Sequence, residues 1–583
     1  MRRLFVSALS ASLAACTTLP HPPPPPPPML APVEVQILAI NDFHGNLEPP
    51  GVTIDATLPD GGIAKVAAGG IAYLAGAAKA LRAGQRHSVT VSAGDMIGAS
   101  PLVSALFLDE PTIAAMNLIG VDYNAVGNHE FDKGSAELLR MQRGGCAKHT
   151  TKVPCAIEPF RGADFRFLAA NVVKADGTTL FPGTGLKDFG TVQVGFIGMT
   201  LKETATLVTP AGVAGLTFAD EAATANAAVP GLKLAGADAI VLLIHQGGRT
   251  TGGYNDKSCP ELSGEIMPIL DRLDPAIEVV VSGHTHAAYI CERARAGGGR
   301  PLLLTSAGQY GTLITDLRLT VDPVLGLVAR RADNVIVQRE GFRSAETDTL
   351  PVAAFARFAA DPATSALVER YVAAARPQAD RVVGRLSGAA TKQPTPSREL
   401  VLGNLIADAQ LGATRNPAKG GAQISFQNSG GVRADLIPAA NGDVTYGQIF
   451  ALQPFGNNLV VKTLTGAQLK SLLEQQFDSG RNSIDRPNIL QPSAGFAFAY
   501  DLKRPAGQRI VSMTLDGQAV DPAARYRVTV PNFLASGGDN FTVLAQGADP
   551  VDAGLDLDAL EAWLRPGRTL PVANRITDLT PKP

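Results

Sequence analysis

The sequence has little net charge, few cysteines and no hydrophobic run long enough to cross a membrane. Its net charge of -2 gives no reason to expect a nucleic-acid polymer or an anionic membrane surface as a partner. The apolar stretch near the start falls short of the ~20 residues that a spanning helix needs. No Cys-x-x-Cys pair occurs among the 5 cysteines, which argues against a zinc site built from cysteine. At ~150 residues per domain the length allows roughly two to four domains, and no internal repeat is found.

The first sixteen residues have the layout of an export signal, with a basic start and a short apolar core that ends at Cys16. The run Leu13-Ala14-Ala15-Cys16 resembles a bacterial lipobox, in which Cys16 would be lipidated and become the new N-terminus. The alternative is an ordinary signal peptide with an incidental cysteine. The proline run 22–28 would extend at ~3.1 Å per residue and hold the protein roughly 20 Å from its anchor. We predict a signal peptide at 1–16 and a tether at 17–32, with lipid anchoring to the bacterial cell envelope, at the periplasm or the cell surface.

Export also gives the other four cysteines a role. An even number of cysteines in an oxidising compartment suggests two disulfides. We favour one bridge between Cys146 and Cys155 and another between Cys259 and Cys291, although two other connectivities remain open.

The mature chain divides into two domains. From 33 to 340, apolar strands alternate with alanine-rich helical stretches, which indicates an α/β layered domain. In the linker 341–378, residues 363–376 have helical spacing and Pro377 follows directly, so we expect a connecting helix that ends there. A second domain is predicted from 379 to 583. Further predicted elements are helices at 69–83, 218–235, 402–411 and 465–477 and a strand at 525–531.

Five apolar strands of the first domain each run into a loop of metal-ligand residue types. The strands are predicted at 33–40, 87–92, 121–126, 238–244 and 277–282, and the loops carry Asp42 and His44, Asp95, Asn128 to Asp132, His245, and His284 with His286. In open α/β sheets ligands bind beyond the carboxyl ends of the strands. One such loop is an ordinary strand end, but 5 of the 8 histidines in these loops together predict a metal site.

The residue types of these loops define the expected chemistry. Carboxylate, amide and imidazole ligands suit two divalent ions such as Zn, Mn or Fe. Asp95 is the best candidate to bridge them, and the other predicted ligands are Asp42, His44, Asn128, His245, His284 and His286. Two ions ~3.5–4 Å apart activate a shared water and stabilise an in-line displacement at phosphorus. We expect His129 to stay free of metal and protonate the leaving alkoxide, with Asp132 orienting its ring.

The order Asp-x-His, Gly-Asp, Gly-Asn-His-Glu, a separate His and Gly-His-x-His resembles the signature of dinuclear calcineurin-like metallophosphatases. The resemblance implies a four-layered α/β/β/α sandwich. It also implies that one ion takes Asp42, His44, Asp95 and His286, and the other takes Asp95, Asn128, His245 and His284. Some relatives carry Gln or Asn where His286 stands, which makes this ligand the least secure.

Motifs of the second domain indicate a nucleotide pocket. A base would stack between Phe455 and Phe533, at ~1–3 kcal/mol per contact. Asp539 would bind a ribose hydroxyl, and Arg398 and Arg433 would hold a phosphate. Taken singly, these residues have ordinary explanations, since arginines are often surface charges and phenylalanines often core.

The same motifs resemble the C-terminal domain of the secreted 5'-nucleotidases, including UDP-sugar hydrolases. The resemblance implies a smaller α/β substrate-binding domain, with Arg398, Asn428, Arg433, Phe455, Phe533 and Asp539 binding substrate. Ser536 stands where some relatives carry Asn. Because members of this family rotate the second domain about a connecting helix, a single unliganded structure can show Phe533 far from Asp95.

The leading hypothesis is metal-dependent hydrolysis of nucleoside 5'-monophosphates to nucleoside and phosphate, extending to UDP-sugars and nucleoside di- and triphosphates. Alternative activities are 2',3'-cyclic nucleotide phosphodiesterase, NAD pyrophosphatase and thiosulfohydrolase. A nucleoside-binding surface lipoprotein is the non-enzyme alternative, but such a protein has no need of His129 and Asp132. The expected partners are a nucleotide and, through the lipid anchor alone, a membrane, in a monomer or dimer.

Overall fold

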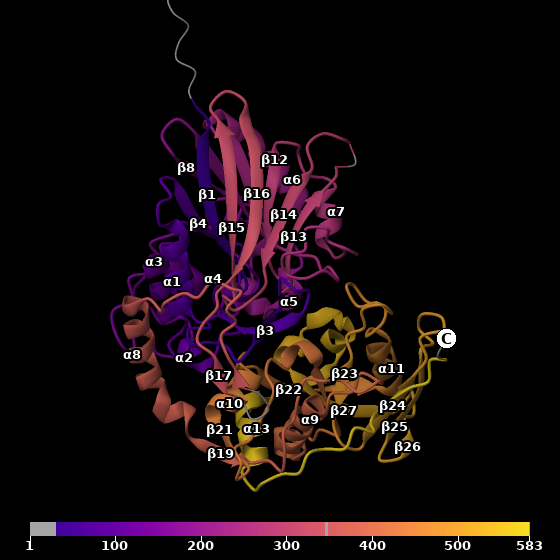
Figure 1. Cartoon of the computed structure of the whole chain (residues 1–583). Helices are drawn as coiled ribbons and strands as arrows, with labels where there is room; N and C mark the ends of the chain where they lie inside the picture. The colour runs from indigo at the N-terminus through magenta and orange to yellow at the C-terminus, as the bar shows by residue number, and fades with distance from the viewer. Residues whose placement is uncertain (1–30, 296, 344–347, 582–583) are drawn as a thin grey trace, which may run out of the picture.

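The computed structural model describes residues 31–295, 297–343 and 348–581 (Figure 1). The predicted signal peptide with Cys16 and nearly all of the proline-rich tether lie outside the described residues. Within the described part of the chain, no helix combines the length and apolar character needed to span a bilayer.

Two six-stranded sheets form the centre of the first domain. One has the strand order β16-β15-β1-β4-β5-β6 and the other β13-β14-β12-β11-β9-β8. The first sheet contains β1 (Val33–Ile40), β4 (Ser88–Ser92), β5 (Tyr123–Ala125), β6 (Arg166–Leu168), β15 (Leu313–Asp322) and β16 (Gly326–Ile336). The second contains β8 (Thr184–Asp188), β9 (Gln193–Thr200), β11 (Ala239–His245), β12 (Ile277–Ser282), β13 (Ala288–Arg293) and β14 (Leu302–Ala307). Among the strands that carry the predicted site residues, β4 is parallel to β1 and to β5, and β11 is parallel to β12.

Alternation along the strands divides the core into layers. In β1, Ile37 points into the cluster between the sheets, together with Phe196 and Val241 of the second sheet. Its neighbour Leu38 points outward into a cluster covered by helices, as the two-residue period of a strand requires. The first sheet is covered by α1 (Ile71–Arg82), α3 (Glu110–Ile119) and α4 (Ser135–Arg143), and the second by α6 (Glu221–Leu234) and α7 (Ile266–Leu270). The expected four-layered α/β/β/α sandwich is confirmed.

The second domain is a smaller α/β unit built on two further sheets, with the orders β23-β20-β27-β22-β28 and β26-β25-β24-β29. The strands are β20 (Ile424–Asn428), β22 (Asn458–Thr465), β23 (Leu490–Pro492), β24 (Phe496–Tyr500), β25 (Ile510–Leu515), β26 (Gln518–Ala519), β27 (Arg525–Pro531), β28 (Ala548–Leu555) and β29 (Ile576–Asp578). The helices are α9 (Val401–Thr414), α10 (Tyr446–Leu452), α11 (Gly466–Glu474), α12 (Asn532–Ala535) and α13 (Asp556–Leu564).

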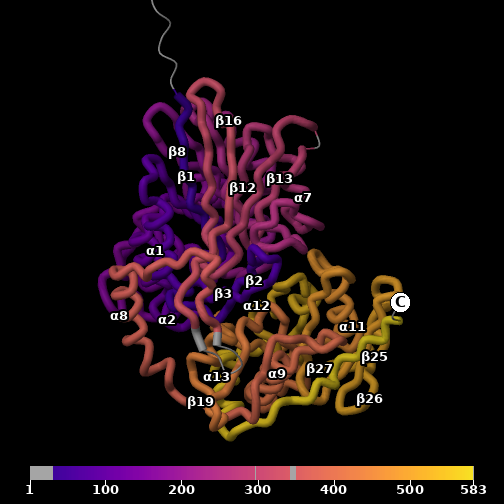
Figure 2. Tube along the Cα trace, in the orientation of Figure 1, coloured from indigo at the N-terminus to yellow at the C-terminus, as the bar shows by residue number. Residues whose placement is uncertain are grey.

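Helix α8 (Pro362–Ala379) joins the two domains and runs along one side of the molecule in Figures 1 and 2. Its buried residues Leu367, Tyr371 and Ala375 pack into the helical layer of the first domain. The prediction that Pro377 ends this helix is wrong. A proline in the last turn removes only one backbone donor, and the N–H of Asp380 still bonds the carbonyl of Arg376 at 2.9 Å. The domain boundaries at 340 and 378 stay predictions.

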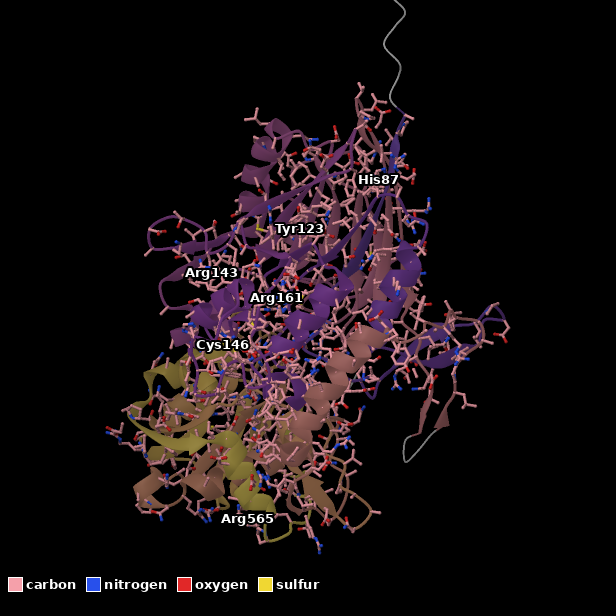
Figure 3. All side chains as sticks on the ribbon, turned by 90° about the vertical axis from the view of Figure 1, so that its left-hand side faces the viewer. His87, Tyr123, Arg143, Cys146, Arg161 and Arg565 are labelled. Atoms are coloured by element: carbon pink, nitrogen blue, oxygen red, sulfur yellow. A yellow bond between two sulfur atoms is a disulfide. The ribbon has the colours of Figure 1, made fainter. Side chains whose placement is uncertain are left out.

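Both favoured disulfides are present. Cys146 bonds Cys155 and Cys259 bonds Cys291, with Cα–Cα distances of 5.5 and 5.6 Å. The first bridge closes a loop where the two domains meet (Figure 3), and Lys152 of this loop lies 5.4 Å from the ring centroid of Phe450 in the second domain.

Candidate active site

The five predicted loops converge at one edge of the paired sheets. Two groups of side chains lie there, and within each group the ligand atoms are all within 4.8 Å of one another. One group is Asp42, His44 and His286, and the other is Asp95, His245 and His284. Six of the seven predicted metal ligands therefore fall into the two sets that the resemblance implies, and the seventh, Asn128, places its Oδ1 3.1 Å from Nδ1 of His284.

The hydrogen bonds of two histidines show that each group fits a cation. His44 Nδ1 lies 2.9 Å from the carbonyl of Gly98 and His245 Nδ1 lies 2.8 Å from that of Ala93, so both Nδ1 atoms donate. Nε2 of His44 then directs its lone pair toward Nε2 of His286 at 3.1 Å. Nε2 of His245 faces a carboxylate oxygen of Asp95 at 2.9 Å. Ring nitrogens and a carboxylate oxygen that face one another at such distances fit a cation between them.

The pKa of His245 indicates that a bound metal ion would take the place of a proton. Burial lowers this pKa, but the adjacent carboxylate of Asp95 raises it overall to about 9. Without a metal ion the pair therefore shares a proton at neutral pH. Because a histidine ligates metal only in its neutral form, a bound divalent ion displaces that proton.

Five of these ligands have left-handed backbone conformations, which non-glycine residues rarely adopt. The φ angles are 49° for Asp42, 48° for His44, 50° for Asp95, 69° for His284 and 58° for His286. Each such residue costs on the order of 1–3 kcal/mol and persists only when its surroundings impose it. Backbone strain is thus concentrated at the two ligand groups.

Glu130 joins the loop that carries Asp95 to the loop that carries Gly127. Its carboxylate accepts the backbone N–H groups of Asp95 at 2.9 Å, Met96 at 2.8 Å and Gly127 at 2.8 Å. Gly127 lies so close that a methyl group on it would meet Asp95 Oδ1 at 2.2 Å. Glu130 is therefore a positioning residue for the Asp95 loop. Its place directly after His129 was the only sequence signal for this role.

His129 stands beside the ligand groups but belongs to neither. Its Nδ1 lies 2.9 Å from Oδ2 of Asp132, and its backbone N–H donates to Asp95 at 2.8 Å. Burial lowers the pKa of His129, yet Asp132 and Asp95 raise it above its ordinary value overall. A histidine oriented by a carboxylate in this way can hold a proton at the ring nitrogen that does not contact the carboxylate.

A cavity of about 170 Å³ lies between the domains and is lined by both. The first domain contributes Asn128, His129, Asp132 and His284, and the second contributes Asn428, Arg433, Phe455, Phe533 and Asp539. The ring of Phe455 stacks against that of His129 with centroids 5.9 Å apart. The structure thus shows the domains closed over one pocket rather than Phe533 held apart from the ligand groups.

The pocket differs from the predicted set in two respects. Arg398 has an exposed side chain and does not line the cavity, so the structure does not bring it together with the other predicted substrate residues. Residues 207–209, at the end of α5 (Thr204–Leu207), and Asn457 line the cavity without having been predicted. No motif marks 207–209, because only the contact between domains places this segment at the pocket.

Comparison with known proteins agrees with both halves of the structure. The family model of the calcineurin-like phosphoesterases matches residues 35–288, and that of the 5'-nucleotidase C-terminal domain matches residues 382–546. The cell wall protein Lmo0130 of Listeria monocytogenes is 30% identical over 555 residues, covering 92% of this chain and 67% of that protein. The chain belongs to the 5'-nucleotidase family.

Other known proteins are also similar to this chain. The 5'-nucleotidase precursor of Thermus thermophilus superposes with a TM-score of 0.73 at 27% identity, covering 94% of this chain and 99% of that one. The endonuclease YhcR of Bacillus subtilis is 28% identical over 536 residues; the match covers 91% of this chain but only 40% of YhcR. The family implies divalent metal ions, and the two ligand groups fit them.

Proposed function

We propose that this enzyme hydrolyses nucleoside 5'-monophosphates to nucleoside and phosphate, and extends to UDP-sugars and nucleoside di- and triphosphates. One observation carries the proposal. A single cavity joins His129 and the metal-ligand candidates Asn128 and His284 to two aromatic rings, Phe455 and Phe533. A phosphatase for small base-free esters needs no such pair of rings, and a pure nucleoside binder needs no metal ligands.

In the proposed complex the second domain holds the nucleoside. The base stacks between Phe455 and Phe533, which both line the cavity. Asp539 accepts a ribose hydroxyl, and its carboxylate is held by Asn428, whose side-chain amide donates to it at 2.6 Å. Arg433, 5.8 Å from the centroid of Phe455, binds the phosphate.

The first domain supplies the chemistry. Asp42, His44, Asp95 and His286 would hold one divalent ion, and Asp95, Asn128, His245 and His284 the other. When bound, such a pair of ions activates a water for in-line attack and neutralises charge on the phosphate. His129, oriented by Asp132, holds a proton near the phosphate and gives it to the leaving 5' oxygen.

We further propose that the protein is exported and anchored to the cell envelope through a lipid on Cys16. The lipobox resemblance and the proline-rich tether support this proposal. The two disulfides support export, because they persist in oxidising compartments. Labelling of the full chain with a fatty-acid analogue, compared with the Cys16→Ser variant, tests the anchor.

Phosphate release from AMP, with and without a metal chelator, tests the proposed activity. We expect release that the chelator abolishes and that added Mn²⁺ or Zn²⁺ restores. A panel of AMP, ATP, UDP-glucose, NAD, 2',3'-cyclic AMP and a thiosulfate conjugate separates the alternatives. Turnover of cyclic AMP, NAD or the conjugate alone would replace the proposal with that activity. Nucleoside binding without any turnover would support the surface-lipoprotein alternative.

A further inference from the structure

Arg481 crosses from the second domain to the metal-ligand groups of the first. It lies on the loop between α11 and β23, and its Nη1 is 3.2 Å from Nε2 of His284. Neither the motifs of the sequence nor the cavity lining marks this residue. Its position next to a metal-ligand candidate depends entirely on the closed arrangement of the domains.

The loop that carries Arg481 is fixed to the turn that holds Asp539. Ser479 Oγ donates to the carbonyl of Asn540 at 2.7 Å, and the side-chain amide of Asn482 donates to the carbonyl of Asp539 at 2.9 Å. Arg481 therefore moves with the proposed ribose-binding residue. When the second domain closes with a bound nucleoside, the same motion brings the guanidinium of Arg481 to the metal-ligand groups.

Arg481 and Arg433 are both partly buried, and in the described part of the chain neither forms an ion pair with a carboxylate. Arg433 lines the cavity and lies 5.8 Å from the ring centroid of Phe455, whereas Arg481 contacts His284. Partly buried cations without a carboxylate partner favour an anionic ligand.

The tautomer of His284 gives an independent reason to expect an anion. Its Nδ1 faces Oδ1 of Asn128, the other neutral ligand of the same group, at 3.1 Å. With Nδ1 used for a metal ion, Nε2 must carry the ring proton. Nε2–H and the N–H of Arg481 are then two donors 3.2 Å apart, with no acceptor between them. An oxygen of an anion would satisfy both.

We propose that Arg481 and Nε2–H of His284 together bind an oxygen of the nucleotide's phosphate group when the domains close. The inference rests on the proposed function and names the second phosphate-binding cation. Arg481 is distinguished from the predicted Arg398 by its contact with His284 and its partial burial, whereas the side chain of Arg398 is exposed.

Arg481→Gln tests the proposal, with Arg486→Gln as the matched control. Arg486 lies on the same loop and carries the same charge, but its side chain is exposed. Calorimetric titration of inorganic phosphate into the Mn²⁺-loaded protein measures the site directly, and KM for AMP and for ribose 5-phosphate measures its use. We expect Arg481→Gln to weaken phosphate binding and raise both KM values by about 10- to 100-fold, as for a lost charged hydrogen bond. Arg486→Gln should stay within about 3-fold.

Arg481→Lys checks the result with a conservative change. It keeps the charge but loses the planar donors, so it should recover part of the affinity. Unchanged phosphate affinity in Arg481→Gln, or an equal loss in Arg486→Gln, would overturn the inference. Failure of the proposed function has a different signature, in which wild-type protein binds phosphate but does not hydrolyse AMP.

Discussion

Asp95 illustrates how single residues organise this site. One carboxylate oxygen accepts the N–H of His129 at 2.8 Å, and the other lies 2.9 Å from Nε2 of His245 and 3.7 Å from Nε2 of His44. Its backbone is left-handed, and Gly127 leaves just enough room beside it. A carboxylate placed between histidines of both ligand groups could bridge two ions, and this role stays a prediction.

His129→Ala should lower turnover of AMP by about 100- to 10,000-fold, because the leaving oxygen loses its proton donor. The variant should keep its full metal content, since the two ligand groups do not include His129. Metal analysis of the purified variant measures this. Loss of one metal equivalent would make His129 a ligand and contradict its role as an acid.

Phe533→Ala and Phe455→Ala should raise KM for AMP by about 5- to 150-fold, which corresponds to ~1–3 kcal/mol for each lost stacking contact. Hydrolysis of ribose 5-phosphate should change little, because this substrate has the ribose and phosphate but no base. Steady-state kinetics with both substrates make the comparison. Equal losses on the two substrates would mean that these rings serve the core rather than the base.

Asp556, at the start of α13, should make the protein less stable as the pH rises. Burial raises its pKa from 3.8 to about 7, and its Oδ2 has no hydrogen-bond partner in the described structure. Between these pH values only the folded state holds the proton, so stability falls with rising pH until about pH 7 and the loss then stays constant.

Asp556→Asn removes this dependence. Relative to the wild type, its free energy of unfolding should rise by roughly 2–3 kcal/mol between pH 5 and pH 8. Urea unfolding at the two pH values measures the difference. Asp558→Asn, an exposed position in the same helix, is the control and should show no such change. A pH-independent difference for Asp556→Asn would contradict the raised pKa.

At the scale of elements, the site follows from where strands end. Parallel strands in one sheet direct their carboxyl ends to the same edge, so β1, β4 and β5 deliver Asp42, Asp95 and Asn128 together. The second sheet does the same with β11 and β12. Packing the two sheets face to face then brings His245 and His284 to the ligands of the first sheet.

The two disulfides close loops of different length, so removing them should lower the stability by different amounts. Their sequence separations are 32 residues for Cys259–Cys291 and 9 for Cys146–Cys155. In the chain-entropy model, replacing both cysteines of a bridge by serine costs about 3.7 kcal/mol for the long loop and about 2.6 kcal/mol for the short one. Chemical denaturation of the two double variants compares them. The reverse order would show that native contacts, not loop length, dominate.

At the scale of the whole molecule, the pocket exists only because the domains are closed. Phe455 stacks on His129 and Arg481 reaches His284, and both pairs join the two domains. A cavity lined from both sides has to open to admit substrate and release product. Helix α8, the covalent link between the halves, is therefore where a rotation would be centred.

Spin labels on cysteines introduced at Ala175 and Ala506, exposed positions in different domains, would detect this opening. We expect more than one distance without nucleotide, and a single closed distance with metal and a non-hydrolysable AMP analogue. Electron spin resonance measures the distribution. One distance that nucleotide does not change would contradict the rotation. A cross-link that holds the domains apart should likewise abolish turnover, and its removal should restore it.

The sequence by itself determined the parts of this protein that depend on near neighbours in the chain. Apolar runs that end in loops identified the strands and the ligand types at their ends, such as β1 followed by Asp42. The even number of cysteines in an exported chain pointed to two disulfides, and the favoured pairing is the one present. These features follow from periodicity and local chemistry, which a short stretch of the sequence is enough to show.

Only the tertiary structure decided which arginines meet the site, that residues 207–209 line the pocket and that α8 continues to Ala379. Arg398 stands in a recognisable motif yet is exposed, whereas Arg481 stands in none and touches His284. Their positions depend on how two domains pack across hundreds of residues of chain. Such contacts are set by the free energy of the whole assembly, and no local pattern encodes them.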